Sequence, residues 1–119
     1  MKKKKLVLIG GHPKGYEEPF HIKTKSGRIL RKITDELRLN PLFFDLWDNQ
    51  AEEDSRTLKG DTKKKLEEFT ENKFVIIALG RYIEKVIIDS GYKCIYLPHP
   101  ASRDAKYLKK LKCGLEKFK

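Results

Sequence analysis

The chain contains few of the residues that build metal clusters or disulfide frameworks. It has two cysteines among 119 residues, Cys94 and Cys113, without a CxxC pair or a histidine at metal-ligand spacing. This pattern excludes a zinc or iron–sulfur site made from four cysteines, and we interpret both residues as free thiols. We therefore expect a protein without a bound metal.

Long apolar runs are also missing. The sequence has no apolar run of about 18 residues or more, and the lysines at its start lead only into LVLIG, which is too short for a signal-peptide core or a membrane span. Hydrophobic residues make up 39% of the chain, enough for the core of one domain over residues 1–119. We expect a soluble, cytoplasmic monomer that does not contact a membrane.

Positive charge, in contrast, is abundant. Lys and Arg number 27 against 17 Asp and Glu, which gives a net charge of +10. This excess indicates an acidic partner, most commonly nucleic acid, although a charged, heat-tolerant surface is the alternative. The charge is uneven, because MKKKK and RDAKYLKKLKCGLEKFK are basic while DLWDNQAEED is acidic.

Short apolar runs alternate four times with helical patterns. The runs are rich in β-branched and aromatic residues, as in strands buried on both faces, and the helical patterns repeat apolar residues at helical spacing. The alternation predicts an α/β fold of three α/β/α layers, with a four-stranded parallel sheet. Numbered along the chain, its strands are expected to lie side by side in the order 2-1-3-4. The expected strands are 5–10, 41–47, 74–80 and 93–98; the expected helices are 26–39, 61–72, 81–91 and one starting at about Ser102 or Arg103.

Individual helices carry further signals. Ile29, Leu30, Ile33 and Leu37 share one face of the first helix. The second is expected to start with an Asp or Thr cap in DTKKKLEEFTEN, and 11–26 and 48–60 are expected to be irregular.

Unusual residues follow the strands. Open parallel sheets bind ligands beyond the carboxyl ends of their strands, where this chain has GGHPKGYEEPF, DNQAEED, GR and HPAS. Neither GxGxxG nor GxxxxGK[ST] follows the first strand, which argues against a dinucleotide or triphosphate ligand. The sequence therefore predicts a site at this rim that uses no cofactor.

Three of these stretches resemble the motifs of the uracil-DNA glycosylase superfamily, especially its iron–sulfur branch. They are LVLIGGHPKGYEEPFHIKTKSGRIL, FVIIALGR and YLPHPAS, in the family's order and at strand ends. The cluster cysteines of that branch are missing, so the resemblance implies a minimal, diverged member. It implies extrusion of uracil or another deaminated base from single-stranded or duplex DNA, followed by hydrolysis of the N-glycosidic bond in base excision repair.

The resemblance also implies a base pocket. Phe20 corresponds to the family's stacking phenylalanine, although a core or lid phenylalanine is the structural alternative. Asn49 corresponds to the asparagine that pairs with the base edge; Asp48 or Gln50 can take its place, and a simple turn asparagine is equally compatible. Gly10 and Pro13 belong to the first loop of this pocket.

Two histidines receive catalytic roles from the resemblance. His99, between Pro98 and Pro100, corresponds to the residue that donates a hydrogen bond to the base oxygen, while a histidine that caps a turn is the alternative. Gly11 corresponds to a residue that is acidic in the iron–sulfur branch, and His12 to one that is an aspartate in the most active uracil enzymes, so neither supplies the family's water-orienting carboxylate. His12 is then a candidate base in its neutral form, with Glu17 or Glu18 as substitutes.

DNA contacts are implied around the last helix. We expect Ser102 to contact a phosphate, Arg103 and Tyr107 to enter the vacated duplex position, and Lys106, with Lys109 and Lys110, to attract the backbone. Two other functions stay open: a catalytically inactive DNA- or base-binding module of the same fold, and a small-molecule enzyme that acts on nucleosides or nucleotides.

Overall fold

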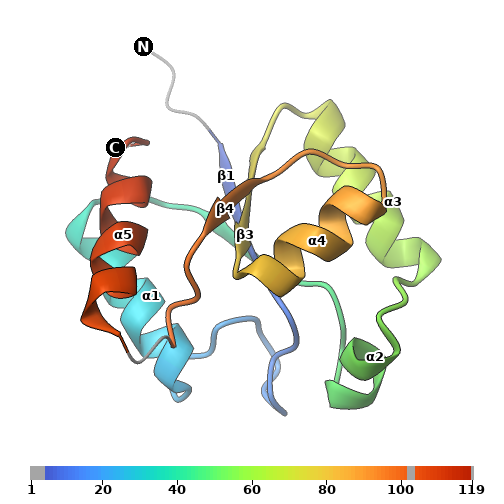
Figure 1. Ribbon diagram of the computed structural model, residues 1–119, viewed down its shortest axis with the longest axis horizontal. Helices are drawn as coiled ribbons and strands as arrows, with labels where there is room; N and C mark the ends of the chain where they lie inside the picture. The colour runs from blue at the N-terminus through green and yellow to red at the C-terminus, as the bar shows by residue number, and fades with distance from the viewer. Residues whose placement is uncertain (1–4, 102–103, 119) are drawn as a thin grey trace.

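The fold alternates strands and helices along the chain (Figure 1). A computed structural model describes residues 5–101 and 104–118, which form four strands and five helices. The strands are β1 (Leu6–Gly10), β2 (Leu42–Asp45), β3 (Val75–Leu79) and β4 (Ile95–Leu97). The helices are α1 (Lys25–Glu36), α2 (Gln50–Ser55), α3 (Gly60–Glu71), α4 (Arg81–Asp89) and α5 (Ala105–Glu116).

All four strands belong to one parallel sheet in the order β2-β1-β3-β4, as the sequence predicts. Strand β1 pairs with β2 from Val7↔Leu42 to Gly10↔Asp45, and with β3 from Leu6↔Val75 to Ile9↔Ala78. Strand β4 pairs with β3 and forms an edge. Because the strands are parallel, their carboxyl ends lie together, at the lower side of Figure 1.

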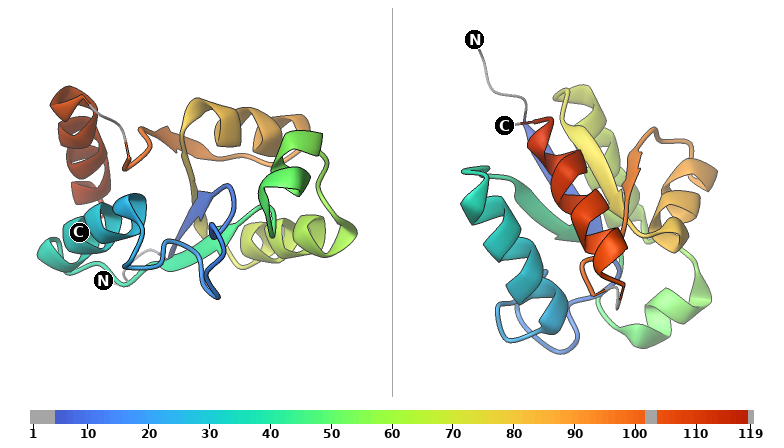
Figure 2. Two further views of the ribbon diagram at one scale, coloured as in Figure 1. Left: turned by 90° about the horizontal axis from the view of Figure 1, so that it is seen from below. Right: turned by 60° about the vertical axis from the view of Figure 1, so that its left-hand side comes forward.

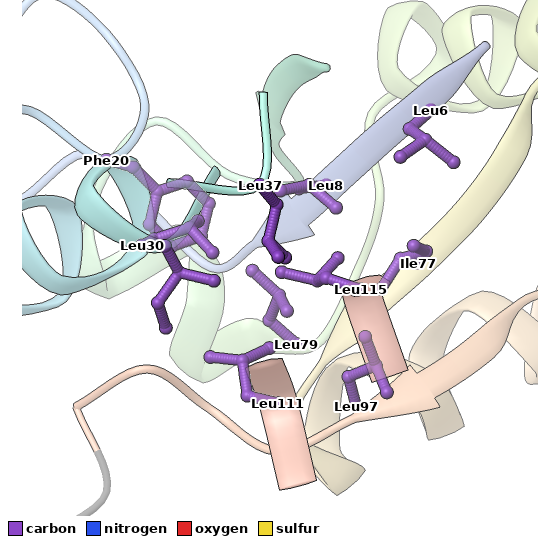
Figure 3. Packing of buried hydrophobic residues seen from close by; sticks show 11 residues of the cluster. Leu6, Leu8, Phe20, Leu30, Leu37, Ile77, Leu79, Leu97, Leu111 and Leu115 are labelled. Carbon is purple, nitrogen blue, oxygen red and sulfur yellow. The ribbon is translucent and has the colours of Figure 1, made fainter. Parts of the chain in front are cut away.

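Helices cover both faces of the sheet, so the fold has three layers (Figure 2). Helices α1 and α5 lie on one face, where their leucines meet alternate residues of β1, β3 and β4 around Leu8 and Leu79 (Figure 3). Helices α3 and α4 lie on the other face, where Leu66 and Ile87 pack with Val7 and Ile9. Alternation of side chains along each strand produces these two separate cores.

The apolar stripe predicted for the first helix is confirmed. Leu30, Ile33 and Leu37 are buried in the core, and Ile29 packs against it. Thr24 caps α1, since its side chain accepts a hydrogen bond from the backbone N–H of Gly27.

The structure corrects three expected boundaries. Residues 48–60 are not wholly irregular, because α2 forms within them. Helix α3 starts at Gly60 after Lys59, so Asp61 and Thr62 lie inside the helix instead of capping it. Helix α5 starts at Ala105 and is capped by Asp104, two residues or more after the expected start.

No helix within residues 5–101 and 104–118 is long and apolar enough to cross a bilayer.

Candidate functional site

A cavity of about 220 Å³ lies at the carboxyl ends of the strands. It is bounded by the loop after β1, the end of β2, helix α2, the start of α1 and the segment after β4. Its lining residues are Gly11, His12, Pro13, Lys14, Phe20, Thr24, Ser26, Asp45, Gln50, Glu53 and His99.

His99 reaches the cavity from the segment after β4. The backbone N–H of Ala101 donates a hydrogen bond of 3.0 Å to His99 Nδ1. An imidazole that accepts at Nδ1 and is neutral carries its proton on Nε2, where it is a donor. Burial, and then the positive charge of Lys14, lower the pKa of His99, against an opposing effect of Glu53. His99 is therefore a neutral imidazole with an N–H to donate.

His12 has the opposite arrangement. Its Nδ1 lies 3.1 Å from Glu53 Oε1 on α2. Because an ionised carboxylate only accepts hydrogen bonds, Nδ1 is the donor, and neutral His12 is left with an acceptor at Nε2. The cavity thus contains one imidazole, His99, suited to donate a hydrogen bond, and another, His12, suited to accept a proton.

Gly11 makes room for the Glu53 carboxylate. A Cβ built on Gly11 would overlap Glu53 Oε1, so any larger residue there would displace the carboxylate. Position 11 is also where the resembled family carries an acidic side chain. Here a carboxylate from α2 fills the space that a side chain at position 11 would need.

Contacts with the sheet and with α4 hold α2 in place. The backbone N–H of Trp47 donates to Gly11 O, and Trp47 Nε1 donates to Thr57 O at 3.0 Å, which fixes both ends of the α2 segment. Tyr82 Oη donates to the carbonyl of Glu53 at 2.8 Å. Gln50, which also lines the cavity, donates to the side chain of Asp54 at 2.8 Å and more weakly to Glu53.

Asp45, the last residue of β2, brings a second carboxyl group to the cavity. Its Oδ2 is buried and has no hydrogen-bond partner among the described residues. Burial raises the pKa of Asp45 to about 7; a positive charge on His12, present only when that ring is protonated, opposes this rise, and the charge of Glu53 adds to it. Near neutral pH a large share of Asp45 is therefore protonated, and a neutral carboxyl group offers one donor and one acceptor.

Phe20 is both a core residue and part of the cavity wall. It is 7% exposed and has a positive φ of 51°, and its ring lies so close to β1 that a Cβ on Gly10 would overlap it. Arg31 holds this turn, since its Nε donates to Phe20 O at 2.7 Å and its Nη2 to Pro19 O at 3.1 Å.

The cavity brings together four of the residues expected from the sequence: His99, His12, Phe20 and Pro13. Gly10 lies beside it as the residue that admits the Phe20 ring.

Asn49 does not line the cavity. Its side chain caps α2, accepting from the backbone N–H of Glu52 at 2.9 Å and donating to the Glu52 side chain at 3.1 Å. Asp48 is exposed and pairs with Lys59, so of the three expected alternatives only Gln50 reaches the cavity wall. Glu17 and Glu18, the alternative bases, are exposed and lie outside this wall.

The residues expected to contact DNA occupy the start of α5 or the segment before it. Lys106 is exposed in the first turn, where its backbone N–H bonds the Asp104 side chain, and Tyr107 is 41% exposed. Ser102 and Arg103 lie outside the described residues. The helix start itself is capped by the carboxylate of Asp104, whose negative charge opposes phosphate binding at this end of α5.

Sequence reasoning missed Asp45 and Glu53. The sequence does point to Asp45, because a carboxylate at the end of an apolar strand lies at the rim of the sheet where ligands bind. The signal for Glu53 is weaker: Asn49 followed three residues later by Glu52 is a capping pattern that predicts a helix, and hence a fixed position for Glu53.

Neither a metal site nor a relative adds to this description. Within residues 5–101 and 104–118, no three His, Cys, Asp or Glu side chains are arranged to hold a metal ion. Comparison of the chain with family models, with curated proteins and with solved structures finds no match.

Proposed function

We propose that this protein is a glycosylase-type hydrolase that cleaves the N-glycosidic bond of uracil or another deaminated base in DNA. One observation carries the proposal: a single rim cavity holds an aromatic ring, a neutral imidazole donor and an imidazole–carboxylate pair. A volume of about 220 Å³ is below the roughly 300–1,000 Å³ typical of drug-sized ligands, which suits a single base.

The chemistry divides between the two imidazoles. As the bond between the sugar carbon and the base nitrogen breaks, its electron pair stays with the base, and Nε2–H of His99 donates a hydrogen bond to the base oxygen where charge develops. Water attacks the sugar carbon and passes a proton to Nε2 of His12, whose Nδ1–H is held by Glu53. The base departs as an anion and takes up a proton, which His12 returns through solvent, so the products are a free base, an abasic sugar with a new hydroxyl group and neutral His12.

Recognition of the base falls to Asp45 and Phe20. A neutral Asp45 carboxyl group offers a donor beside an acceptor, which matches the adjacent carbonyl and N–H of uracil and satisfies the buried Oδ2. The Phe20 side chain gives the cavity an apolar wall against which a flat ring can pack.

An oligonucleotide with one uracil tests the proposal. We expect wild-type protein to release uracil and leave an abasic site, and His99→Ala to lower the rate about 10²–10³-fold, the usual effect of removing one donor to a developing oxyanion. Binding of the oligonucleotide by His99→Ala should change little. Strands containing uracil, hypoxanthine or xanthine should be tried both single-stranded and in duplexes.

Two results would count against hydrolysis. Folded protein in excess that releases no base from any of these substrates would contradict the proposal. If such protein still bound the strands, the noncatalytic base-binding module would be the better description.

A further inference from the structure

A second hollow adjoins the candidate site at His99. It is an open groove of about 800 Å³ along the edge of the sheet, and His99 lines both the groove and the cavity. Its wall also includes Arg81, Tyr96, Pro98, Tyr107 and Lys110. A polymer occupying both hollows would therefore pass His99.

Arg81 and Tyr96 form a flat platform in this groove. The Arg81 Cζ lies 3.6 Å from the centroid of the Tyr96 ring, and Arg81 Nη1 lies 3.0 Å from Glu84 Oε1, so two contacts fix the guanidinium. Its side chain is nevertheless 73% exposed. The guanidinium carbon is therefore in contact with the ring, while most of the Arg81 side chain is open to solvent.

The opposite wall of the groove repeats this chemistry more loosely. Tyr107, on α5, is 41% exposed, and Lys110 Nζ lies 5.8 Å from the centroid of its ring. Arg81 and Lys110 therefore each place a positive charge beside an aromatic ring of the groove, and Glu84, the carboxylate that contacts Arg81, is not part of the groove wall. Aromatic rings beside cations are the surface on which unpaired bases stack and phosphates bind.

We infer that the groove binds single-stranded DNA, with the base of a nucleotide next to the target stacked on the exposed Arg81 side chain. Stacking of this kind needs a base already separated from its neighbours, which a single strand supplies and a duplex does not. An extended peptide fits less well, because the edge strand β4 is only three residues long and leads into Pro98.

The inference rests on the proposed function for the place of the target base, but its test does not need catalysis. Binding of a labelled, undamaged oligothymidylate is measured by fluorescence anisotropy for wild-type protein and variants. We expect Arg81→Ala to weaken binding between about fivefold and a hundredfold, the usual range for loss of one base-stacking side chain. The single strand should bind more tightly than the matching duplex.

Two further variants separate stacking from charge. Lys65→Ala is the matched control, because Lys65 pairs with Glu68 three residues later on α3, as Arg81 does with Glu84 on α4, and it lies outside the groove. It should weaken binding much less than Arg81→Ala. Arg81→Lys keeps the charge but loses the planar group, so it should bind nearly as weakly as Arg81→Ala.

Several outcomes would overturn the inference. Equal weakening by Arg81→Ala and Lys65→Ala would mean diffuse attraction by the net charge, and unchanged binding by Arg81→Lys would mean charge without stacking. Equal or tighter binding of the duplex would exclude the single strand as the occupant. Sedimentation could also reveal a dimer that Arg81→Ala dissociates and the oligonucleotide does not, and the occupant of the groove would then be a second copy of the chain. If wild-type protein binds through Arg81 but releases no base, the groove stands and the proposed hydrolysis fails.

Discussion

At the scale of single residues, the candidate site depends on which nitrogen of each imidazole carries a proton. His99 accepts from a backbone N–H and His12 donates to a carboxylate, so their remaining nitrogens differ in polarity. Neither assignment could be predicted from the sequence, because both partners, Ala101 N–H and the Glu53 carboxylate, depend on the fold. The resemblance predicted His99 as a donor and His12 as a candidate base, but the partners that fix which ring nitrogen carries the proton became visible only in the fold.

The buried carboxyl group of Asp45 should make stability fall as pH rises. Its pKa of about 7 in the folded protein lies above the ordinary value of 3.8, so the folded protein binds more protons between these values and loses stability from about pH 4 to about pH 7. Asp45→Asn, which cannot ionise, should remove this loss, worth at most about 4 kcal/mol at pH 8, since one pKa unit is about 1.4 kcal/mol.

Urea denaturation at several pH values measures this effect. The exposed Asp89, which pairs with Lys85, provides the control Asp89→Asn, and this variant should keep the wild-type loss of stability. If Asp45→Asn shows the same slope as wild type between pH 4 and pH 7, Asp45 is not the group responsible.

Gly11 is a second position at which one residue controls the site. Gly11→Ala should push the Glu53 carboxylate away from His12 and lower the rate of base release about 10²-fold or more, as expected when a general base loses its orientation. Gly60→Ala is the control, because a Cβ there meets nothing within 4 Å. Single-turnover rates on a uracil strand provide the comparison, and an unchanged rate in Gly11→Ala would remove Glu53 from the mechanism.

At the scale of elements, helix α2 is the part of the fold that the sequence did not reveal. It has six residues, none of them buried, so it lacks the apolar periodicity by which the other helices were predicted. The strands were predictable because β1 and β3 are short, almost continuously buried apolar runs. Because this helix carries Glu53, the pattern of apolar residues in the sequence predicted the sheet and its covering helices better than it predicted the candidate site.

The hydrogen bond between Tyr82 and α2 can be removed without changing a charge. Tyr82→Phe loses the 2.8 Å bond to Glu53 O but keeps the ring beside Trp47, and we expect a loss of about 1 kcal/mol in unfolding free energy together with slower base release. Tyr92→Phe is the matched control, because Tyr92 Oη also donates to a carbonyl 29 residues away, that of Lys63 on α3.

Chemical denaturation and excision rates together distinguish the two tyrosines. Tyr92→Phe should lose no more stability than Tyr82→Phe and keep the wild-type rate, since α3 does not line the cavity. Equal rates in the two variants would show that the position of α2 does not limit the reaction.

At the scale of the whole molecule, the net charge of +10 acts on folding and on binding with opposite signs. Repulsion among like charges destabilises the compact chain, whereas the same charges attract a polyanion. The exposed ion pairs, such as Lys85–Asp89 and Lys112–Glu36, are each worth little, so they do not reverse the balance. Added salt screens both effects and therefore separates them.

We therefore expect added sodium chloride to raise the melting temperature by a few degrees while weakening DNA binding. With about three or four phosphate contacts, the slope of log K against log salt for a single strand is about −2 to −3, which is a loss of roughly twentyfold or more between about 50 mM and about 200 mM salt. Thermal unfolding and anisotropy titrations over one salt series measure both quantities. A melting temperature that falls as salt is added would show that the ion pairs outweigh the repulsion. A binding constant that does not change with salt would argue against any polyanionic partner.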